Sequence, residues 1–363
     1  MSKAAELAAL IGSQTALSNR NLIINGAMQV AQRGTQTDQT SAYTACDRFE
    51  FTETGATVVT TSQDTTVPSG QGFTSSLKID VTTADSSLAS GDFVVLSQTI
   101  EAQNLQQLKY GTSSAENVTL SFWVRSPKTG THIIELRHHD ASLYNSQTYT
   151  ISSADTWQYV TVTYSGYTAT AINNDNGKGF LVDWILAAGS DFTSGTLSSD
   201  TWHSTQANRA VGQVNVVDNT ANNFYLTGVQ LEVGSQATPF EHRSFGEELA
   251  LCQRYYYHTY SYGTPAGSTF NQDYEAPIII IGTGNHGMGV CNGVYPVEMR
   301  ASPTVSFYGS DGTANRIRHW NSSSLSAYGT VNRSTRQILG MSFNAGTNTE
   351  DFYSAALVCD AEL

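Results

Sequence analysis

Residues 118–125 read VTLSFWVR, and this stretch decides the fold class. Apolar side chains fall at every second position, while Trp123 lies among polar neighbours on the other side. Because successive residues of a strand point to opposite faces of a sheet, this period of two predicts a half-buried β-strand. Further strands are expected at 159–164, where the alternation returns, and at 180–186 (FLVDWIL), where both faces are apolar.

Turn-forming clusters separate these strands throughout residues 21–243. They include VPSGQG at 67–72, SPKTG at 126–130 and NNDNGKG at 173–179. Many short strands with such joints predict an all-β sandwich, and a jelly roll is the arrangement we expect. Since 363 residues exceed what one hydrophobic core normally serves, a second domain should follow.

Charge and cysteine usage exclude several classes of function. The formal net charge of -13 repels nucleic-acid phosphates and acidic membrane surfaces, so we expect neither nucleic-acid binding nor membrane insertion. The four cysteines are too far apart for a zinc or redox motif and read as buried free thiols. They are Cys46, Cys252, Cys291 and Cys359.

A linker helix is expected at 244–257, where Ser244 and Glu247 form a capping box. Leu249, Cys252 and Tyr256 would then share one face, which packs either around the axis of a trimer or on the chain's own jelly roll. Residues 258–363 predict a second, smaller β-sandwich. Its strands are expected at 278–281, within VYPVEMRASPTVSFYG and within FYSAALV.

The first twenty residues form a leader of a different kind. In MSKAAELAALIG, Leu7, Ala8 and Ile11 share a helical face, but so short a helix is ordered only when it docks on a partner. The alternatives are an anchor for assembly and a frayed tail. Glu6 interrupts the apolar run, so we expect neither a signal peptide nor a membrane span, and synthesis in the cytoplasm without export.

Several stretches resemble a family of bacteriophage tail-fibre and virion proteins. The most specific is FYLTGVQLEVGSQATPFEHRSFGEELALCQRYY at 224–256, and NLIINGAMQVAQRGT at 21–35, LSFWVRS and TWQYVTVTY support it. The likeness covers about residues 20–257, and VEMRASPTVSFY with ALVCDAEL resembles the C-terminal knobs of phage fibres more loosely. It implies a homotrimer, a jelly roll akin to carbohydrate-binding modules with NLIING as its first strand, and a leader that attaches to other virion tail proteins.

Many carbohydrate-binding jelly rolls hold calcium between their first and last strands. Here Thr227 and Gly228 stand where those modules tend to place Asp, so hard oxygen ligands are lacking. The GxGxxG match at 282–287 precedes a Gly- and Pro-rich run rather than a helix, and neighbours His138 and His139 should point to opposite faces of a strand. We therefore expect no metal, no cofactor and no catalytic residues.

The expected function is that of a non-enzymatic phage virion fibre that recognises a glycan or protein on the host surface. One alternative is a decorating protein of the head or tail that binds no host ligand. A polysaccharide-cleaving tailspike would need two suitably spaced carboxylates, but the long repeats usual in such enzymes are missing from the sequence. A secreted carbohydrate-binding module would need an export signal.

Two places are candidates for ligand binding. In NRIRHW at 315–320, strand alternation puts Arg316, Arg318 and Trp320 on one face, which suits an acidic glycan, with Tyr328 as a second stacking surface. The alternative is that these residues pair across a trimer interface. The other place is Trp123, which either stacks on a sugar ring or is covered by a subunit or loop.

Replacement of both Leu7 and Ile11 by Asp should release fibres from virions and leave the protein folded. Each side chain would lose roughly 1.5–3 kcal/mol of apolar burial in its docking groove. The measurement is the amount of this protein in purified particles, with Lys3→Ala as a control outside the apolar face. Full occupancy in the double variant would show that the leader is not the anchor.

Overall fold

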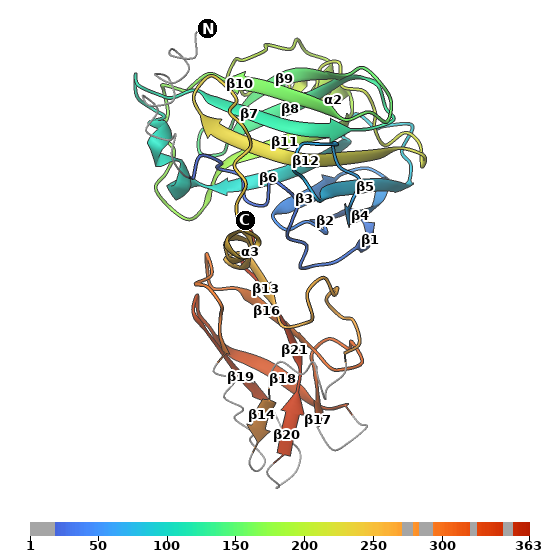
Figure 1. The fold of residues 1–363 in the computed structure, drawn as a ribbon, viewed down its shortest axis with the longest axis vertical. Coiled ribbons are helices and arrows are strands. Elements are labelled where there is room, and N and C mark those ends of the chain that lie inside the picture. Colours follow the sequence, from blue (N-terminus) through green and yellow to red (C-terminus); the bar gives the residue numbers. More distant parts are fainter. Residues whose placement is uncertain (1–18, 271–278, 283–292, 320–324, 344–350) are drawn as a thin grey trace. The chain divides into compact units, whose positions relative to one another are not determined.

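The computed structural model describes residues 19–270, 279–282, 293–319, 325–343 and 351–363 (Figure 1). The chain divides into two compact units. Unit 1 comprises residues up to 29, 37–44 and 49–243, and unit 2 comprises 30–36, 45–48 and 244–363. The short segments 30–36 and 45–48, which the sequence placed in the jelly roll, thus belong to unit 2. The leader residues Leu7, Ala8 and Ile11 lie outside the described residues.

Unit 1 is a sandwich of two antiparallel six-stranded sheets, as the sequence predicted. Sheet A has the order β1 (Gln36–Gln39), β4 (Val58–Asp64), β5 (Ser76–Thr83), β12 (Asn223–Val233), β7 (Val118–Arg125) and β10 (Gln158–Tyr164). Sheet B has the order β2 (Ser41–Tyr43), β3 (Phe49–Glu53), β6 (Phe93–Glu101), β11 (Lys178–Ala188), β8 (Gly130–His138) and β9 (Leu143–Ile151). Short helical segments are η1 (Ala102–Leu108), α2 (Ser190–Thr193) and η2 (Gln206–Asn208).

The core of unit 1 is centred on Trp184, whose side chain is fully buried. Its ring centroid lies 5.6 Å from that of Phe122 in the other sheet and 6.1 Å from that of Phe49. Burial of each such side chain contributes roughly 1.5–3 kcal/mol. Since inward residues alternate with outward ones, the same packing fixes which side chains of β7 and β10 reach the outer face of sheet A.

The expected first strand, NLIING, is not a regular strand. Residues 21–26 instead follow β12 irregularly: the Leu22 amide donates to the Leu231 carbonyl, and the Val229 amide donates to the Gly26 carbonyl, both at 2.9 Å. A Cβ at Gly26 would lie 2.1 Å from the Val229 oxygen, so this close approach requires glycine. The segment lies beside the last strand of unit 1 but turns too sharply to form a ladder.

Unit 2 combines helix α3 (Phe245–Gln253) with two antiparallel sheets. The capping box between Ser244 and Glu247 is confirmed. Tyr256 does not share a helical face with Cys252, because the helix ends at Gln253 and Tyr256 begins β13. One sheet has the order β13 (Tyr256–His258), β21 (Ala356–Asp360), β16 (Thr304–Tyr308); the other has β14 (Ile279–Gly282), β20 (Asp351–Ser354), β17 (Arg316–His319), β18 (Leu325–Ser334), β19 (Ile338–Phe343), β15 (Gly293–Val294).

Three cysteines are free and buried, as predicted, namely Cys46, Cys252 and Cys359. Burial raises the pKa of the Cys46 and Cys252 thiols, which disfavours the reactive thiolate. Cys291 lies outside the described residues, as does most of the GxGxxG match. Within the described part of the chain, no helix is long and apolar enough to cross a membrane.

Buried charges hold the short segments of unit 2 in place. The Arg48 guanidinium pairs with Glu362 and lies 3.5 Å from the Tyr255 ring centroid. The Arg33 guanidinium lies 3.1 Å from the same carboxylate and 3.6 Å from the Tyr256 ring centroid. The Arg48 and Glu362 side chains are only 1% and 3% exposed, so each charge depends on its partner.

Arg48→Met should lower the free energy of unfolding by about 3–5 kcal/mol, because it leaves a buried carboxylate with one cation fewer. The matched control is Arg336→Met in the same unit, where the ion pair with Glu298 is 45% exposed on both sides and should contribute at most about 1 kcal/mol. Urea denaturation followed by circular dichroism measures both. Equal losses would mean that the buried network adds nothing beyond a surface pair.

Candidate functional site

The structure describes the residues of the two predicted ligand sites to different extents. In unit 2, Arg316 and Arg318 lie on β17 as expected, and Arg316 is paired in register with Tyr328 of β18. The register shifts between Ile317 and Arg318. Trp320 lies outside the described residues, so this stripe stays a prediction. The Trp123 site lies wholly within unit 1 and is described in full.

Trp123 lies on the outer face of sheet A, as the alternation predicted. It is half-buried, and Tyr159 of the neighbouring strand β10 is directly opposite it in register. The two ring centroids are 5.2 Å apart, and Tyr159 is 45% exposed. Together they form one aromatic wall, of which the outer ring faces solvent.

A second aromatic wall comes from two segments distant in sequence. The Phe73 ring centroid lies 5.0 Å from that of Phe240 and 5.5 Å from that of His242. Between the walls is a hollow of about 380 Å³. Its lining residues are Gln71, Phe73, Ser121, Trp123, Tyr159, Gly228, Pro239, Phe240 and His242. We call this hollow the aromatic pocket.

A β-bulge at Gly228 makes the aromatic pocket possible. The pairing of β12 with β7 shifts register between Thr227 and Gln230, and Gly228 adopts a φ of 62°. A Cβ there would lie 2.6 Å from the Phe73 ring and 3.0 Å from the Trp123 ring. Only glycine therefore lets both rings close over the strand at this point.

Polar side chains lie among the aromatic rings of the pocket. Gln71, Ser121 and His242 supply hydrogen-bonding atoms, while no Asp, Glu, Lys or Arg is among the described lining residues. Nearby, on the same face, Lys78 pairs with Asp80 at 3.1 Å and Arg125 with Asp155 at 3.2 Å. Uncharged rings with a few hydrogen-bonding groups suit a neutral ligand that offers a flat apolar face.

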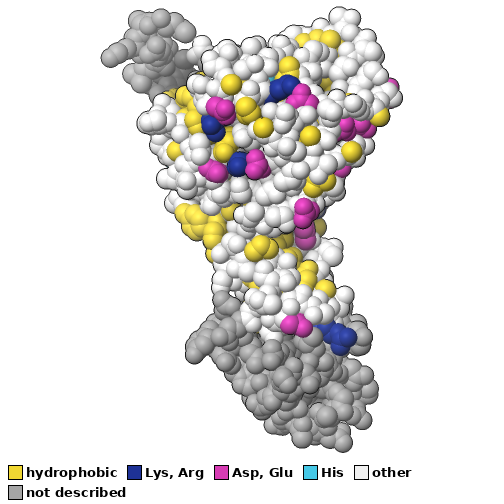
Figure 2. All heavy atoms as spheres, turned by 90° about the vertical axis from the view of Figure 1, so that its right-hand side faces the viewer, with side chains coloured by type: hydrophobic (Ala, Val, Ile, Leu, Met, Phe, Trp, Pro, Cys, Tyr) yellow, Lys and Arg dark blue, Asp and Glu magenta, His cyan; other side chains and the backbone are white. Residues whose placement is uncertain are grey.

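The surface charges do not gather into a basic patch on the face of the described residues that Figure 2 shows. There the Lys and Arg side chains lie beside Asp or Glu side chains, with hydrophobic side chains scattered between them. Neutralised cations of this kind offer little attraction to a phosphate backbone.

Two carboxylates do lie side by side on sheet B, where Asp183 of β11 is paired in register with Glu135 of β8. Both are fully buried and engaged. Arg209 lies 2.7 Å from Glu135, and Arg137 lies 2.6 Å from Asp183. Burial raises the pKa of Glu135, against the opposing effect of Arg209. Each carboxylate is thus paired with a guanidinium group, so the two belong to an ion-pair network.

Residues 21–26, the first segment, lie beside β12, and their carbonyl oxygens there already have a cationic partner. There the Arg243 guanidinium donates to the carbonyl oxygens of Ile23, at 3.0 Å, and Asn21. Thr227 bonds to the Ser75 carbonyl at 2.8 Å, and Gly228 offers no side chain. A calcium ion therefore does not fit. Elsewhere in the described residues, no group of three or more His, Cys, Asp or Glu is placed to hold a metal.

The two adjacent histidines diverge, as predicted. His138 is buried, and its ring lies 3.2 Å from the Thr170 carbonyl oxygen, while His139 is exposed. Burial lowers the pKa of His138, which keeps it neutral. Neither residue belongs to the aromatic pocket.

Sequence reasoning found Trp123 but missed its partners. Tyr159 was detectable, because it lies on the polar side of an alternating strand. The other wall was not detectable, because Phe73 lies more than 150 residues before Phe240 and His242 and both segments are irregular, without a period. Only the fold brings these segments together.

A scan against protein-family models finds no match, and a search of curated proteins finds no related sequence. Among solved structures, the enzymatically active domain of bacteriophage CBA120 tailspike protein 4 is 13% identical, with a TM-score of 0.32, over 59% of this chain and 21% of that chain. A putative sugar-binding protein from Bacteroides thetaiotaomicron is 12% identical, with a TM-score of 0.32, over 59% and 100% of the two chains. A structure described as CBM4 is 13% identical, with a TM-score of 0.27, over 58% and 97%. The chain spans about a fifth of the tailspike domain.

Proposed function

We propose that this protein is a non-enzymatic fibre of a phage virion that binds a neutral host-surface glycan in the aromatic pocket. The observation that carries the proposal is the pair of aromatic walls around a hollow of about 380 Å³. Aromatic faces pack against the C–H faces of sugar rings, while Gln71, Ser121 and His242 can bond hydroxyl groups. The volume lies within the range of small-ligand sites, roughly 300–1,000 Å³.

The place of the protein in a virion is the second part of this proposal. It rests on the resemblance of residues 20–257 to phage fibre proteins, which implies attachment through the leader and a homotrimer. The described residues that line the aromatic pocket include no Asp or Glu, which supports binding rather than hydrolysis, because glycoside cleavage commonly requires two carboxylates beside the bond.

Tyr159→Ala should weaken glycan binding about 3- to 10-fold, since stacking on one exposed ring contributes roughly 0.5–1.5 kcal/mol. The measurement is tryptophan fluorescence during titration with neutral and acidic oligosaccharides, together with competition for phage adsorption to host cells. The comparison variant combines Arg318→Ala with Trp320→Ala, in the other predicted ligand site, and should compete like the parent.

Salt dependence separates the two sites further. Binding of a neutral glycan in the aromatic pocket should change little between about 0.05 and 0.5 M salt, whereas an acidic glycan on two arginines would be released as screening increases. A folded Tyr159→Ala protein that binds and competes like the parent would rule out the aromatic pocket. Loss of glycan binding only in the Arg318/Trp320 variant would place the ligand site on the stretch 315–320 instead.

Sedimentation velocity of the full chain should give a trimer that persists on dilution to micromolar concentration. The reason is the fibre resemblance, in which three copies share one axis. Chemical cross-linking gives an independent count of the subunits. A stable monomer under these conditions would contradict the trimer, while leaving the aromatic pocket, which is built within one chain, unaffected.

A further inference from the structure

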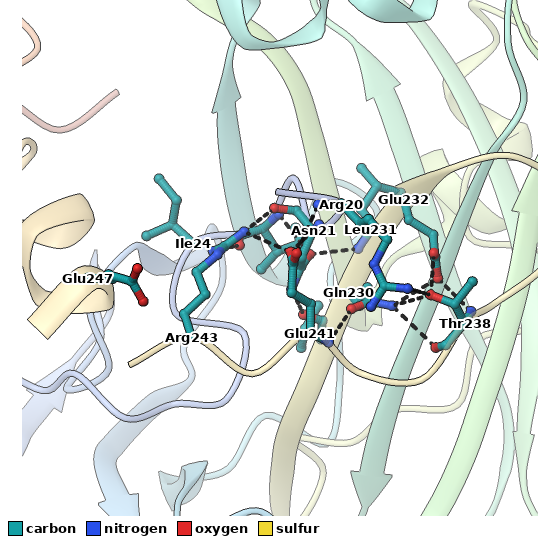
Figure 3. Close-up of polar contacts among 12 residues, drawn as sticks. Arg20, Asn21, Ile24, Gln230, Leu231, Glu232, Thr238, Glu241, Arg243 and Glu247 are labelled. Atoms are coloured by element: carbon teal, nitrogen blue, oxygen red, sulfur yellow. Dashed lines mark hydrogen bonds and ion pairs between the residues drawn. The ribbon is translucent and has the colours of Figure 1, made fainter. Parts of the chain in front are cut away.

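The segment Thr238–Arg243 has two sides with different tasks. Phe240 and His242 line the aromatic pocket. Three other residues of the segment bond to the first described part of the chain and to β12, namely Thr238, Glu241 and Arg243 (Figure 3). From Phe240 to Arg243, successive side chains thus alternate between the aromatic pocket and the first described part of the chain. We call residues 238–243 the connector.

Glu241 is the centre of the inner side of the connector. Its carboxylate accepts hydrogen bonds from the backbone amides of Arg20, at 3.2 Å, and Asn21, at 2.8 Å. The Glu241 amide donates to the side-chain oxygen of Gln230 in β12 at 2.8 Å. The side chain of Glu241 is 15% exposed, so these bonds are largely shielded from water.

The other two inner residues add bonds at either end. The Thr238 hydroxyl donates to Glu232 at 2.7 Å and accepts from Arg20 at 2.9 Å. At the far end, Arg243 donates to the carbonyl oxygens of Asn21 and Ile23. The connector is thus tied to residues 20–23 along its whole length.

Asn21 passes this restraint on to the sheet. Its side-chain amide donates to the Val229 carbonyl at 3.0 Å, and its side-chain oxygen accepts from the amides of Ile23, at 3.0 Å, and Leu231, at 3.1 Å. Asn21 is only 5% exposed. Partial loss of such a buried network leaves polar groups unpaired, which favours its forming and breaking as one unit.

We propose that the connector couples occupancy of the aromatic pocket to the order of residues 21–24, which follow the leader in sequence. A neutral oligosaccharide packed against Phe240 and His242 restrains the connector backbone and, through Glu241 and Arg243, the first segment. Coupling of this kind is reciprocal, so loosening the first segment weakens the aromatic pocket by the same factor. The effect of the bound sugar, which is the ligand half of the proposal, rests on the proposed function. The dependence of residues 21–24 on the connector, which is its mechanical half, does not.

Hydrogen exchange of the amides of residues 21–24 tests the mechanical half without any sugar. His242→Ala and Phe240→Ala, on the connector, should speed exchange at least about tenfold. Tyr159→Ala is the matched control, because it lines the same aromatic pocket from β10 and should leave exchange unchanged. His242 is exposed, so its replacement leaves the fold intact. Unchanged exchange in both connector variants would overturn the coupling.

The second arm adds a β-1,4-linked glucose tetrasaccharide or the neutral oligosaccharide from the titration panel that gives the largest fluorescence change. Saturation of the aromatic pocket with this sugar should slow exchange of the amides of residues 21–24. Glu241→Gln loosens the same residues and should therefore weaken binding of the sugar. Binding without any change in exchange would overturn the coupling and leave the proposed function standing. If exchange is faster in His242→Ala and Phe240→Ala but none of the oligosaccharides binds the parent protein, the link between the connector and residues 21–24 would stand and the proposed glycan site would not.

Discussion

The bulge at Gly228 is the constraint on which the candidate site depends. It interrupts β12, which lies between β5 and β7 in sheet A, at the point where the Phe73 and Trp123 rings approach the backbone. Without the register shift, β12 would continue its ladder with β7 and a side chain would fill this space. The same strand, beyond the bulge, presents Gln230 and Glu232 to the connector. The bulge thus separates the part of β12 that lines the aromatic pocket from the part that bonds to the connector.

Arginine side chains supply the internal cations of this acidic protein. In unit 1, Arg209 pairs with Glu135 while the rings of Phe93, Tyr144 and Phe192 surround its guanidinium, and Arg243 bonds the first segment. In unit 2, Arg48 and Arg33 share Glu362. A planar guanidinium stacks on rings and donates in several directions at once, which a lysine or a hydrated metal ion cannot reproduce in the same space. The net charge of the chain therefore says little about its interior.

The strands and the cap of α3 could be predicted from sequence because both depend on local patterns. Period two marks β7 and β10, a continuous apolar run marks β11, and the capping box marks Ser244. NLIING was taken as a strand from the fibre resemblance. Its irregular bonds to β12 leave no period in the sequence that could have corrected this prediction. Tyr256 was placed on the helix because its spacing fits a turn, but pairing with Asp360 draws it into β13.

The candidate site shows why sequence reasoning found one residue of a constellation. Trp123 was recognisable because a large aromatic among polar neighbours on a strand must face outward. The opposite wall depends on a loop at 71–73 and on the connector, whose alternation between the aromatic pocket and the first segment appears only once both surfaces are known. The sequence TPFEHR at 238–243 has no pattern that marks Glu241 and Arg243 as residues with buried partners. The structure buries most of each side chain, and their bonds to backbone groups tie this short irregular segment, which forms one wall of the aromatic pocket, to residues 20–23.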